Sequence, residues 1–386
     1  MRILHFLPVY APAWQFGGPV LSVSRLCEGL VRERVDVRVI TTNAGLPDFP
    51  HSQLGLPQKI KGVEVIYYPV NHHSGVIRSE KLLEALPDHM DWADLVHLSS
   101  IWQPLGIPVQ EAAAAAAVPV IQTPRGALGP YSWKRHWWKK IPYFVFRERA
   151  LLQRAAALHC TTSQEARELS WLGLRPPIHL LPNPLDVTQL SYDPALGRQW
   201  RQQNRIPSSQ PLLLVAGRMH HKKGLDLLPR VLKKVAHLPW QIVFVGPDDD
   251  GTGLRLRNTL DIMGLKERCH WFDSLPAEQL SGPYNAADCL LLPSHHENFG
   301  NVVVEALLCG CGVLISQNVG VAGNLLSCPG VSVIPRDTTL WSSHLLKVLN
   351  TNRPGASSCD WVSDKFSSQS VAREAAKLYS YLLNLS

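Results

Sequence analysis

The sequence lacks several features that would assign it at once to a particular class. It contains no apolar run of about 18 residues, so no membrane-spanning helix is expected. Its 8 cysteines form no CxxC pair and offer no zinc-ligand spacing. A chain of this length builds its core without disulfides, so reduced thiols in a cytoplasm are the default. No GxGxxG fingerprint is present, which argues against a nicotinamide-dependent enzyme.

The composition is that of an ordinary folded protein with a basic balance. Apolar residues make up 45% and charged residues 18% of the 386 residues, and the net charge is +7. This length predicts two domains of roughly 200 residues or slightly fewer each. The first residues, MRILHFLPVYAPA, imitate a signal peptide, but His5 and Pro8 interrupt the short apolar core. We therefore interpret residues 2–7 as the first strand of a sheet.

Strands and helices alternate along the chain, which predicts an α/β protein with parallel sheets. A strand, a glycine loop, a helix and a second strand follow one another over residues 2–41, as in a Rossmann-like unit. Gly17 and Gly18 in this loop would let the backbone approach a phosphate or a sugar, although such a pair is also common in plain turns. Polar, proline-rich sequence over 182–211 fits a linker to a second unit.

The most informative stretch is residues 290–316, LLLPSHHENFGNVVVEALLCGCGVLIS. An apolar strand leads into a polar loop, and a helix then begins at Gly300 or Asn301. Free N–H groups and the helix dipole at such a point favour an anionic ligand. Glu297 and Glu305 lie eight positions apart, so both can face a ligand at the helix end. Backbone donors suit phosphate and carboxylates suit hydroxyls, which suggests a sugar nucleotide; the alternative is a chance pair of surface glutamates.

This stretch resembles the Glu-x7-Glu signature of the family-4 glycosyltransferases (glycosyl transferases group 1), retaining enzymes of the GT-B architecture. The match includes PS before the loop, ENFG within it and VVVEAL after it. The resemblance implies that the donor is bound by the following residues, with the first two near both its diphosphate and the acceptor: Gly17, Gly18, Glu297, Asn298, Phe299, Gly300, Asn301 and Glu305.

The resemblance also implies the architecture. Two Rossmann-like domains with parallel sheets would face each other across a cleft. We expect an acceptor-binding domain over 1–186 and a nucleotide-sugar-binding domain over 187–370. The helix over 371–386 would cross back to the N-terminal domain.

A second motif, GRMHHKKG over residues 217–224, is similar to the GR-x3-KKG of the same family. Arg218 and Lys223 lie in a loop between a strand and a helix. Both side chains donate hydrogen bonds and accept none, as a diphosphate requires. The alternative is a solvated basic turn.

The N-terminal domain departs from the family pattern at one place. Many members end a strand with His-Gly, where the histidine lies near the transferred sugar; here Arg125 precedes Gly126. Arg125 could bind a phosphate or an acidic acceptor. His97, at the end of a neighbouring strand, is the nearest candidate for the histidine role, or else a hydrogen-bonded core residue. The string TPRGALGPYSW resembles exopolysaccharide and O-antigen glycosyltransferases.

Residues 133–154 form a basic and aromatic segment. Seven positive side chains face one acid, Glu148, so the segment carries +6 (7 − 1) of the total +7. The cations are Lys134, Arg135, Lys139, Lys140, Arg147, Arg149 and Arg154, and the interleaved aromatics are Trp133, Trp137, Trp138, Tyr143, Phe144 and Phe146. On a helix they suit an anionic membrane surface. Packing of the aromatics inside the domain is the alternative; no nucleic-acid motif accompanies them, so no nucleic acid is expected.

The combined prediction is a retaining hexosyl- or glycosyltransferase. It would move a sugar from a nucleotide diphosphate to a hydroxyl of a lipid-linked or saccharide acceptor in polysaccharide biosynthesis. Arg218 and Lys223 would stabilise the leaving diphosphate, Glu297 would hold the donor sugar and Glu305 the ribose. No metal or other cofactor is expected, and the enzyme would be cytoplasmic or peripheral on the inner face of the membrane. A GT-B epimerase or phosphorylase and a non-catalytic carbohydrate-binding protein are the rivals.

Overall fold

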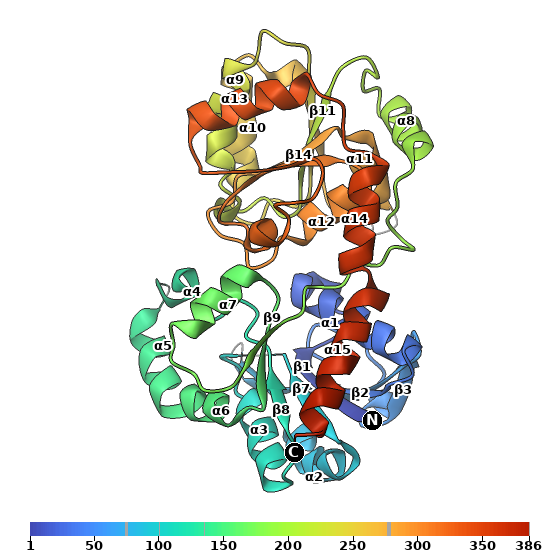
Figure 1. The fold of residues 1–386 in the computed structure, drawn as a ribbon, viewed down its shortest axis with the longest axis vertical. Helices are drawn as coiled ribbons and strands as arrows, with labels where there is room; N and C mark the ends of the chain where they lie inside the picture. Colours follow the sequence, from blue (N-terminus) through green and yellow to red (C-terminus); the bar gives the residue numbers. More distant parts are fainter. Residues whose placement is uncertain (74–75, 100, 135, 276–278, 386) are drawn as a thin grey trace. The chain divides into compact units, whose positions relative to one another are not determined.

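The computed structural model describes residues 1–73, 76–99, 101–134, 136–275 and 279–385. The chain forms two compact units. Unit 1 comprises Met1–Pro184 and Ser368–Ser386, and unit 2 comprises Leu185–Ser367. Each unit is built on its own sheet with helices packed on it (Figure 1), which confirms the predicted α/β class.

Unit 1 contains an 8-stranded sheet in the order β10-β9-β8-β7-β1-β2-β4-β3. Its strands are β1 (Arg2–Val9), β2 (Asp36–Thr42), β3 (Pro57–Ile60), β4 (Val63–Tyr68), β7 (Leu95–Leu98), β8 (Val120–Gln122), β9 (Ala157–Cys160) and β10 (Ile178–Leu180). All neighbours pair in parallel except β3, which runs antiparallel to β4. Residues 45–61 were expected to be a loop. The prediction missed β3 because this edge strand is only partly buried and carries no apolar run.

The helices of unit 1 are α1 (Gly18–Arg32), α2 (Glu80–Trp92), α3 (Gly106–Ala115), α4 (Pro130–Lys134), α5 (Trp137–Tyr143), α6 (Arg149–Arg154), α7 (Ser163–Ser170) and α15 (Ser368–Leu383), with a small hairpin of β5 (Asn71–His73) and β6 (Val76–Arg78). The single helix expected over 133–154 is instead broken into pieces. A π-helical turn, Phe144–Glu148, separates α5 from α6, and Pro142 lies inside α5.

The C-terminal helix α15 belongs to unit 1 and packs against α1 (Figure 1). The two helices approach closely at Gly29. A Cβ atom there would lie 2.6 Å from the carbonyl oxygen of Ser368 and 2.8 Å from the Cβ of Ala372. Ala372 and Tyr379 of α15 are fully buried in the unit 1 core, so the helix completes that core.

Unit 2 contains a 6-stranded parallel sheet in the order β13-β12-β11-β14-β15-β16. Its strands are β11 (Leu212–Ala216), β12 (Gln241–Val245), β13 (Cys269–Phe272), β14 (Cys289–Leu292), β15 (Gly312–Ser316) and β16 (Val331–Ile334). Its helices are α8 (Pro194–Gln203), α9 (Leu228–Lys234), α10 (Thr252–Ile262), α11 (Ser281–Ala286), α12 (Asn301–Leu308), α13 (Thr338–Leu349) and α14 (Ala356–Phe366).

Part of the linker expected over 182–211 is helix α8. It packs on α11, since a Cβ at Gly282 would lie 2.4 Å from Trp200.

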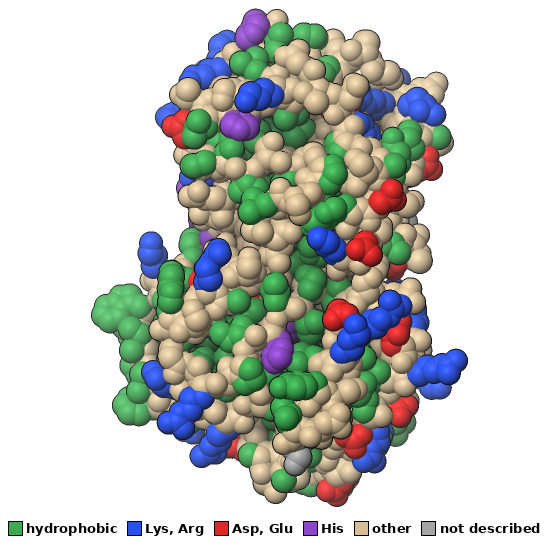
Figure 2. Space-filling view, viewed as in Figure 1, with side chains coloured by type: hydrophobic (Ala, Val, Ile, Leu, Met, Phe, Trp, Pro, Cys, Tyr) green, Lys and Arg blue, Asp and Glu red, His purple; other side chains and the backbone are tan. Residues whose placement is uncertain are grey.

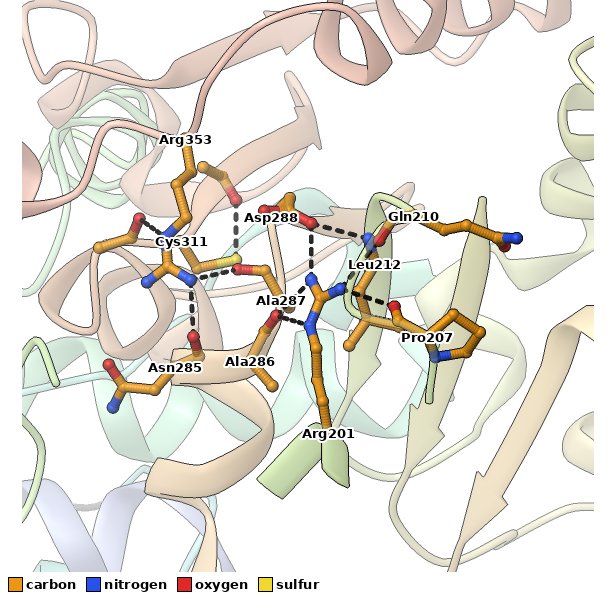
Figure 3. Close-up of polar contacts among 12 residues, drawn as sticks. Arg201, Pro207, Gln210, Leu212, Asn285, Ala286, Ala287, Asp288, Cys311 and Arg353 are labelled. Carbon is orange, nitrogen blue, oxygen red and sulfur yellow. Dashed lines mark hydrogen bonds and ion pairs between the residues drawn. The ribbon is translucent and has the colours of Figure 1, made fainter. Parts of the chain in front are cut away.

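Two arginines fix the end of α11 and the strands that start beside it (Figure 3). Arg201 donates to the Ala286 carbonyl through Nε and Nη2, at 2.9 and 2.7 Å, and pairs with Asp288 at 2.8 Å. Arg353 donates to the carbonyl oxygens of Asn285 at 2.6 Å and Cys309 at 2.9 Å. These bonds satisfy carbonyl groups that a helix end leaves without partners. They hold the β14 side of the sheet, from which the site below emerges.

Candidate active site

The loop after β11 is shaped so that Lys223 points toward the loop after β14. Gly217 and Gly224 have φ angles of 101° and 63°. A Cβ at Gly224 would lie 2.1 Å from the Pro293 carbonyl oxygen, so the two loops can approach closely only with glycine there. The His295 N–H donates to the Lys222 carbonyl oxygen at 2.8 Å and joins the loops.

Lys223 and Glu297 form an ion pair between these two loops. The distance from Lys223 Nζ to Glu297 Oε1 is 2.7 Å, and the side chains are 17% and 20% exposed. The Glu297 loop is held on its other side by Gly320, whose N–H donates to the Glu297 carbonyl oxygen at 2.9 Å. The two predicted residues thus meet in a fixed, partly buried position that a ligand can still reach.

The N-terminus of α12 lies beside this pair. Gly300 caps the helix with a φ of 95°, and Asn301 is its first residue. A Cβ at Gly217 would be 3.6 Å from Val302 Cγ1 and 3.7 Å from Lys223 Nζ, so the first turn of α12 and the lysine converge on the same glycine. The positive end of the helix dipole therefore reinforces the charge of Lys223.

Glu305 lies about one turn further along α12 and is 7% exposed. Its Oε2 accepts a hydrogen bond of 3.0 Å from the Tyr284 hydroxyl. Burial raises the pKa of Tyr284 well above its ordinary value, and the neighbouring Glu305 carboxylate adds to the shift. This hydrogen bond orients the Glu305 carboxylate from the protein side.

Arg218 takes a different direction from Lys223. Its Nη1 lies 3.2 Å from Asp249 Oδ2 on the loop after β12, and its side chain is 66% exposed. The sequence predicted that the two cations act as a pair, whereas the structure pairs each of them with a different carboxylate.

Sequence reasoning missed Arg336, which follows β16 and ties both site loops together. Its guanidinium donates to the carbonyl oxygens of Pro293 at 2.7 Å and Gly224 at 3.3 Å, and pairs with Asp226 at 3.0 Å. No sequence motif marks Arg336. Strand β16, which precedes it, could have indicated a loop residue at the sheet edge, but that strand was not predicted.

Within the described ranges, one group has the composition of a metal site: His220, His221 and Asp250, whose ligand atoms all lie within 4.8 Å of one another. Its hydrogen bonds are already assigned to the turn. His221 Nδ1 lies 2.9 Å from Asp250 Oδ2, and His220 Nδ1 accepts from the Lys222 N–H at 3.2 Å. Hydrogen bonds from Thr252 and then His221 hold the pKa of Asp250 well below its usual value. We interpret the group as a support for the Lys223 turn, and the expectation of no metal stays a prediction.

In unit 1, His97 is a core residue, so the catalytic role predicted for it is corrected. It is fully buried. Its Nδ1 lies 2.7 Å from the Tyr379 hydroxyl and its Nε2 lies 2.8 Å from Thr123 Oγ1. Burial lowers its pKa well below the ordinary value. Because both ring nitrogens are engaged within unit 1, His97 positions α15 and β8 rather than a substrate.

Arg125 and the Gly17–Gly18 turn meet at the carboxyl edge of the unit 1 sheet. Arg125 Nη1 donates to the hydroxyl of Ser22 at 2.9 Å, and Ser22 lies in α1, which begins at Gly18. Gly17 caps α1 with a φ of 82°, and a Cβ there would meet nothing within 4 Å. The roles predicted for Gly17, Gly18 and Arg125 stay predictions.

The basic aromatic segment divides into a buried and an exposed part. Phe144 is 5% exposed, and Trp133 packs edge-on against it with ring centroids 5.2 Å apart. By contrast, the following side chains project outward: Trp137 (60%), Trp138 (59%), Ile141 (46%), Val145 (51%) and Phe146 (81%). Figure 2 shows hydrophobic side chains protruding from the edge of unit 1 where Figure 1 places α5, with Lys and Arg side chains beside them.

Packing inside the domain therefore describes part of this segment, and the membrane surface stays a prediction for the exposed part. Lys134, Lys139, Arg147, Arg149 and Arg154 are exposed, whereas Arg135 lies outside the described residues. Among the helices that the structure describes, none has the length and apolar character needed to cross a membrane.

Glu148, the only acid in this segment, gives unit 1 a pH-dependent stability. Its carboxylate is 3% exposed, and burial raises its pKa from 4.5 to about 7. The folded state thus binds more protons than the unfolded state between these two values, so stability falls as pH rises through that window. We expect Glu148→Gln to stabilise the protein above pH 7, by up to about 3 kcal/mol, and to change little below the window.

Urea denaturation at pH 5 and pH 8 would measure this difference. Glu111→Gln, an exposed carboxylate on α3, is the control and should show no such pH-dependent gain. An equal effect of Glu148→Gln at both pH values would contradict the prediction.

Solved structures with a similar fold include glycosyltransferases, such as one from Rickettsia africae. The chain is similar over 100% of both proteins to sucrose-phosphate synthase from Thermosynechococcus elongatus, with a TM-score of 0.76 and 19% identity. It is similar to Anabaena HepE in complex with UDP and glucose over 99% of this chain and 100% of that one, with a TM-score of 0.74 and 18% identity. These likenesses define the fold as GT-B.

Family models match both halves of the chain. A glycosyl transferase 4-like domain matches residues 17–184, and glycosyl transferases group 1 matches residues 198–352. The chain therefore belongs to the family-4 glycosyltransferases, as its motifs predicted, and is an enzyme of the glycosyltransferase class.

Among characterised relatives, the D-inositol 3-phosphate glycosyltransferase of Arthrobacter sp. is 25% identical over 352 residues, which cover 83% of this chain and 78% of that protein. The 2-deoxystreptamine glucosyltransferase of Streptomyces kanamyceticus is 27% identical over 253 residues, or 63% of this chain and 65% of that protein. The match to the corresponding inositol phosphate enzyme of Xylanimonas cellulosilytica covers 50% of its length.

Proposed function

We propose that the protein transfers a sugar from a nucleotide diphosphate sugar to a hydroxyl group of an acceptor, with retention of configuration. The observation that carries the proposal is the partly exposed Lys223–Glu297 pair, 2.7 Å apart, beside the N-terminus of α12. The solved structures of Anabaena HepE, crystallised with UDP-glucose, support a nucleotide sugar as the donor.

The chemistry follows from where charge develops. When the bond between the sugar and the phosphate breaks, negative charge grows on the leaving diphosphate. Lys223 and the N–H groups at the start of α12 are already positioned, so they stabilise that charge without reorganising. Binding of the diphosphate replaces Glu297 as the partner of Lys223. Glu297 is then released toward the hydroxyls of the donor sugar and the positive charge that develops on its ring.

The remaining predicted residues take supporting roles. Glu305, oriented by Tyr284 at 3.0 Å, accepts hydrogen bonds from the ribose hydroxyls. Arg218 contacts the diphosphate after exchanging its Asp249 partner, which its 66% exposure permits. Asn298, Phe299 and Gly300 shape the loop around the donor. The family resemblance supports retention, by attack on the same face with assistance from the leaving group.

We propose a lipid-linked or saccharide acceptor, reached from an anionic membrane surface. The exposed aromatic and aliphatic face of residues 137–146 suits the interfacial zone of a bilayer, where amphipathic rings are favoured. The exposed Lys139 and Arg147 are placed within the same segment to meet anionic headgroups.

This surface can be tested with vesicles. Lys139→Gln with Arg147→Gln removes two charges, each contributing about 1 kcal/mol at an anionic surface, so we expect binding roughly 30-fold weaker. Replacing Trp137, Trp138 and Phe146 by serine should weaken it further. Co-sedimentation with phosphatidylglycerol vesicles measures both. Trp171→Ser, at a side chain 75% exposed elsewhere in unit 1, is the control. Unchanged binding of both variants would remove the membrane proposal.

Donor specificity can be tested by a thermal-shift screen of UDP-, GDP- and ADP-sugars. A donor at 100 times its Kd adds about 2.7 kcal/mol of stability. Release of free sugar from the stabilising donor then separates a transferase from a carbohydrate-binding protein, and conversion to an isomeric sugar nucleotide would identify an epimerase. A protein that no activated sugar stabilises would contradict the proposal.

A further inference from the structure

Arg125, at the carboxyl edge of the unit 1 sheet, is a cation to which the proposed mechanism gives no role. Arg125 follows β8 with a φ of 52°, a left-handed conformation that side chains other than glycine rarely adopt. Glu165 of α7 holds this turn, because its carboxylate accepts from the Gly126 N–H and from Thr161 at 2.8 Å. An arginine kept in such a conformation by its surroundings suggests a function for its side chain.

Arg125 is partly exposed, and its guanidinium hydrogen-bonds to uncharged partners among the described residues. Nη1 donates to Ser22 Oγ at 2.9 Å and to Asn183 Oδ1 at 3.3 Å, and Nη2 lies 3.5 Å from Ser99 Oγ. These three partners come from α1, from the end of β7 and from the segment after β10. The buried Nε has no hydrogen-bond partner. One donor of the guanidinium is therefore unused.

The charge of Arg125 is not paired directly with a carboxylate. Arg125 makes no ion pair within the described part of the chain, although the Glu165 carboxylate acts on it from a greater distance. Glu165 is itself engaged by Gly126 and Thr161. The charges of His5, His97 and His159 would also act on Arg125, but burial keeps these rings neutral by lowering the pKa of each. A partly buried cation without a direct ion-pair partner is costly in the free protein and can bind an anion.

We propose that Arg125, Ser22 and Ser99 bind a phosphate group of the acceptor at the N-terminus of α1. The inference rests on the proposed function, because it takes unit 1 as the acceptor-binding unit. A phosphate suits the site better than a carboxylate, because its additional oxygens can accept from the guanidinium, from both hydroxyls and from the helix end together. Soluble sugar phosphates and lipid-linked saccharides both carry such a group.

The test is calorimetric titration of the full-length protein with inorganic pyrophosphate, while unit 2 is saturated with the nucleoside diphosphate of the donor that the thermal-shift screen identifies. Arg125→Asn removes the charge, and asparagine tolerates a left-handed backbone. Arg34→Asn is the matched control, since Arg34 is an exposed arginine of unit 1 with a φ of 62°. We expect Arg125→Asn to weaken pyrophosphate binding at least tenfold, and Arg34→Asn to leave it within twofold of the wild type.

Stabilisation by the same nucleoside diphosphate should be unchanged in Arg125→Asn, which would show that the variant is folded and that its donor site is intact. Pyrophosphate binding within twofold of the wild type in Arg125→Asn would overturn the inference, as would equal competition by acetate. Because no sugar is turned over in this experiment, its result is independent of the proposed transfer. Vesicles that contain polyprenyl phosphate, compared with phosphatidylglycerol vesicles of equal charge, then identify the molecule that carries the phosphate. Tighter binding to the polyprenyl phosphate vesicles that Arg125→Asn abolishes indicates a lipid-linked phosphate. Equal binding to both kinds of vesicle indicates a soluble sugar phosphate.

Discussion

Lys223→Ala is expected to lower the rate of sugar transfer by about 10²–10³. Removing one preorganised donor to a developing negative charge has an effect of this size in other enzymes. Lys223 is suited to that role because its ammonium lies 2.7 Å from Glu297 and next to the first turn of α12. The measurement is the rate of nucleoside diphosphate release with the donor identified by the thermal-shift screen.

Two further variants sharpen this experiment. Lys233→Ala removes the same charge from an exposed position on α9 and should leave the rate within about twofold of the wild type. Glu297→Gln leaves Lys223 without its ion-pair partner, so diphosphate binding should tighten while transfer falls, because Glu297 no longer stabilises the sugar ring. A Lys223→Ala variant as active as Lys233→Ala would show that the leaving group is stabilised elsewhere.

Gly320→Ala is expected to displace the Glu297 loop and to destabilise unit 2. A Cβ at Gly320 would lie 1.8 Å from the Asn298 carbonyl oxygen and 3.1 Å from the Glu297 carbonyl oxygen. Both neighbours are backbone atoms. Gly320 N–H donates to the Glu297 carbonyl oxygen and Val321 N–H donates to the Phe299 carbonyl oxygen, so the backbone is held on both sides of Asn298 and cannot move without disrupting the loop. We expect a loss near the upper end of the range for overpacking, about 3 kcal/mol.

The unfolding midpoint of unit 2 should accordingly fall by roughly 10 °C, and stabilisation by the donor should be lost. Gly106→Ala is the control, because the nearest atom to a Cβ there is the Leu98 side chain at 3.8 Å, an ordinary contact. Calorimetry with and without donor measures both effects. If Gly320→Ala kept the wild-type midpoint and donor affinity, the Glu297 loop would not depend on this close approach.

Sequence patterns predicted most of the elements that place the site. Apolar runs predict buried strands over residues 63–68, 241–245 and 289–292, and β4, β12 and β14 have these bounds, because a continuous apolar run between turn residues is a local signal. The same signal was weak for β3 and β16. Every described residue of these two strands except Ile334 is at least partly exposed, so neither reads as a core strand. Helices α13 and α14 were not predicted. Each buries only a few of its residues, so neither has a strong apolar stripe.

The side-chain contacts of the candidate site were predicted only in part. Glu297 and Lys223 were expected near one ligand because both follow parallel strands, and the structure brings them together. The pairing of Arg218 with Asp249, the contact of Glu305 with Tyr284 and the position of Arg336 follow from loop conformations. Those conformations depend on contacts between distant segments, which no local spacing encodes.

The sequence by itself determined the family, the two α/β units and the loops in which the functional side chains lie, because these follow from apolar periodicity and from motifs a few residues long. The tertiary structure alone decided three matters. It buried His97 among Thr123, His159 and Tyr379, it turned one part of residues 133–154 outward, and it left Arg125 without a direct ion-pair partner among the described residues. Burial and charge compensation are properties of the neighbours that folding brings together, and those neighbours come from elements far apart in the chain.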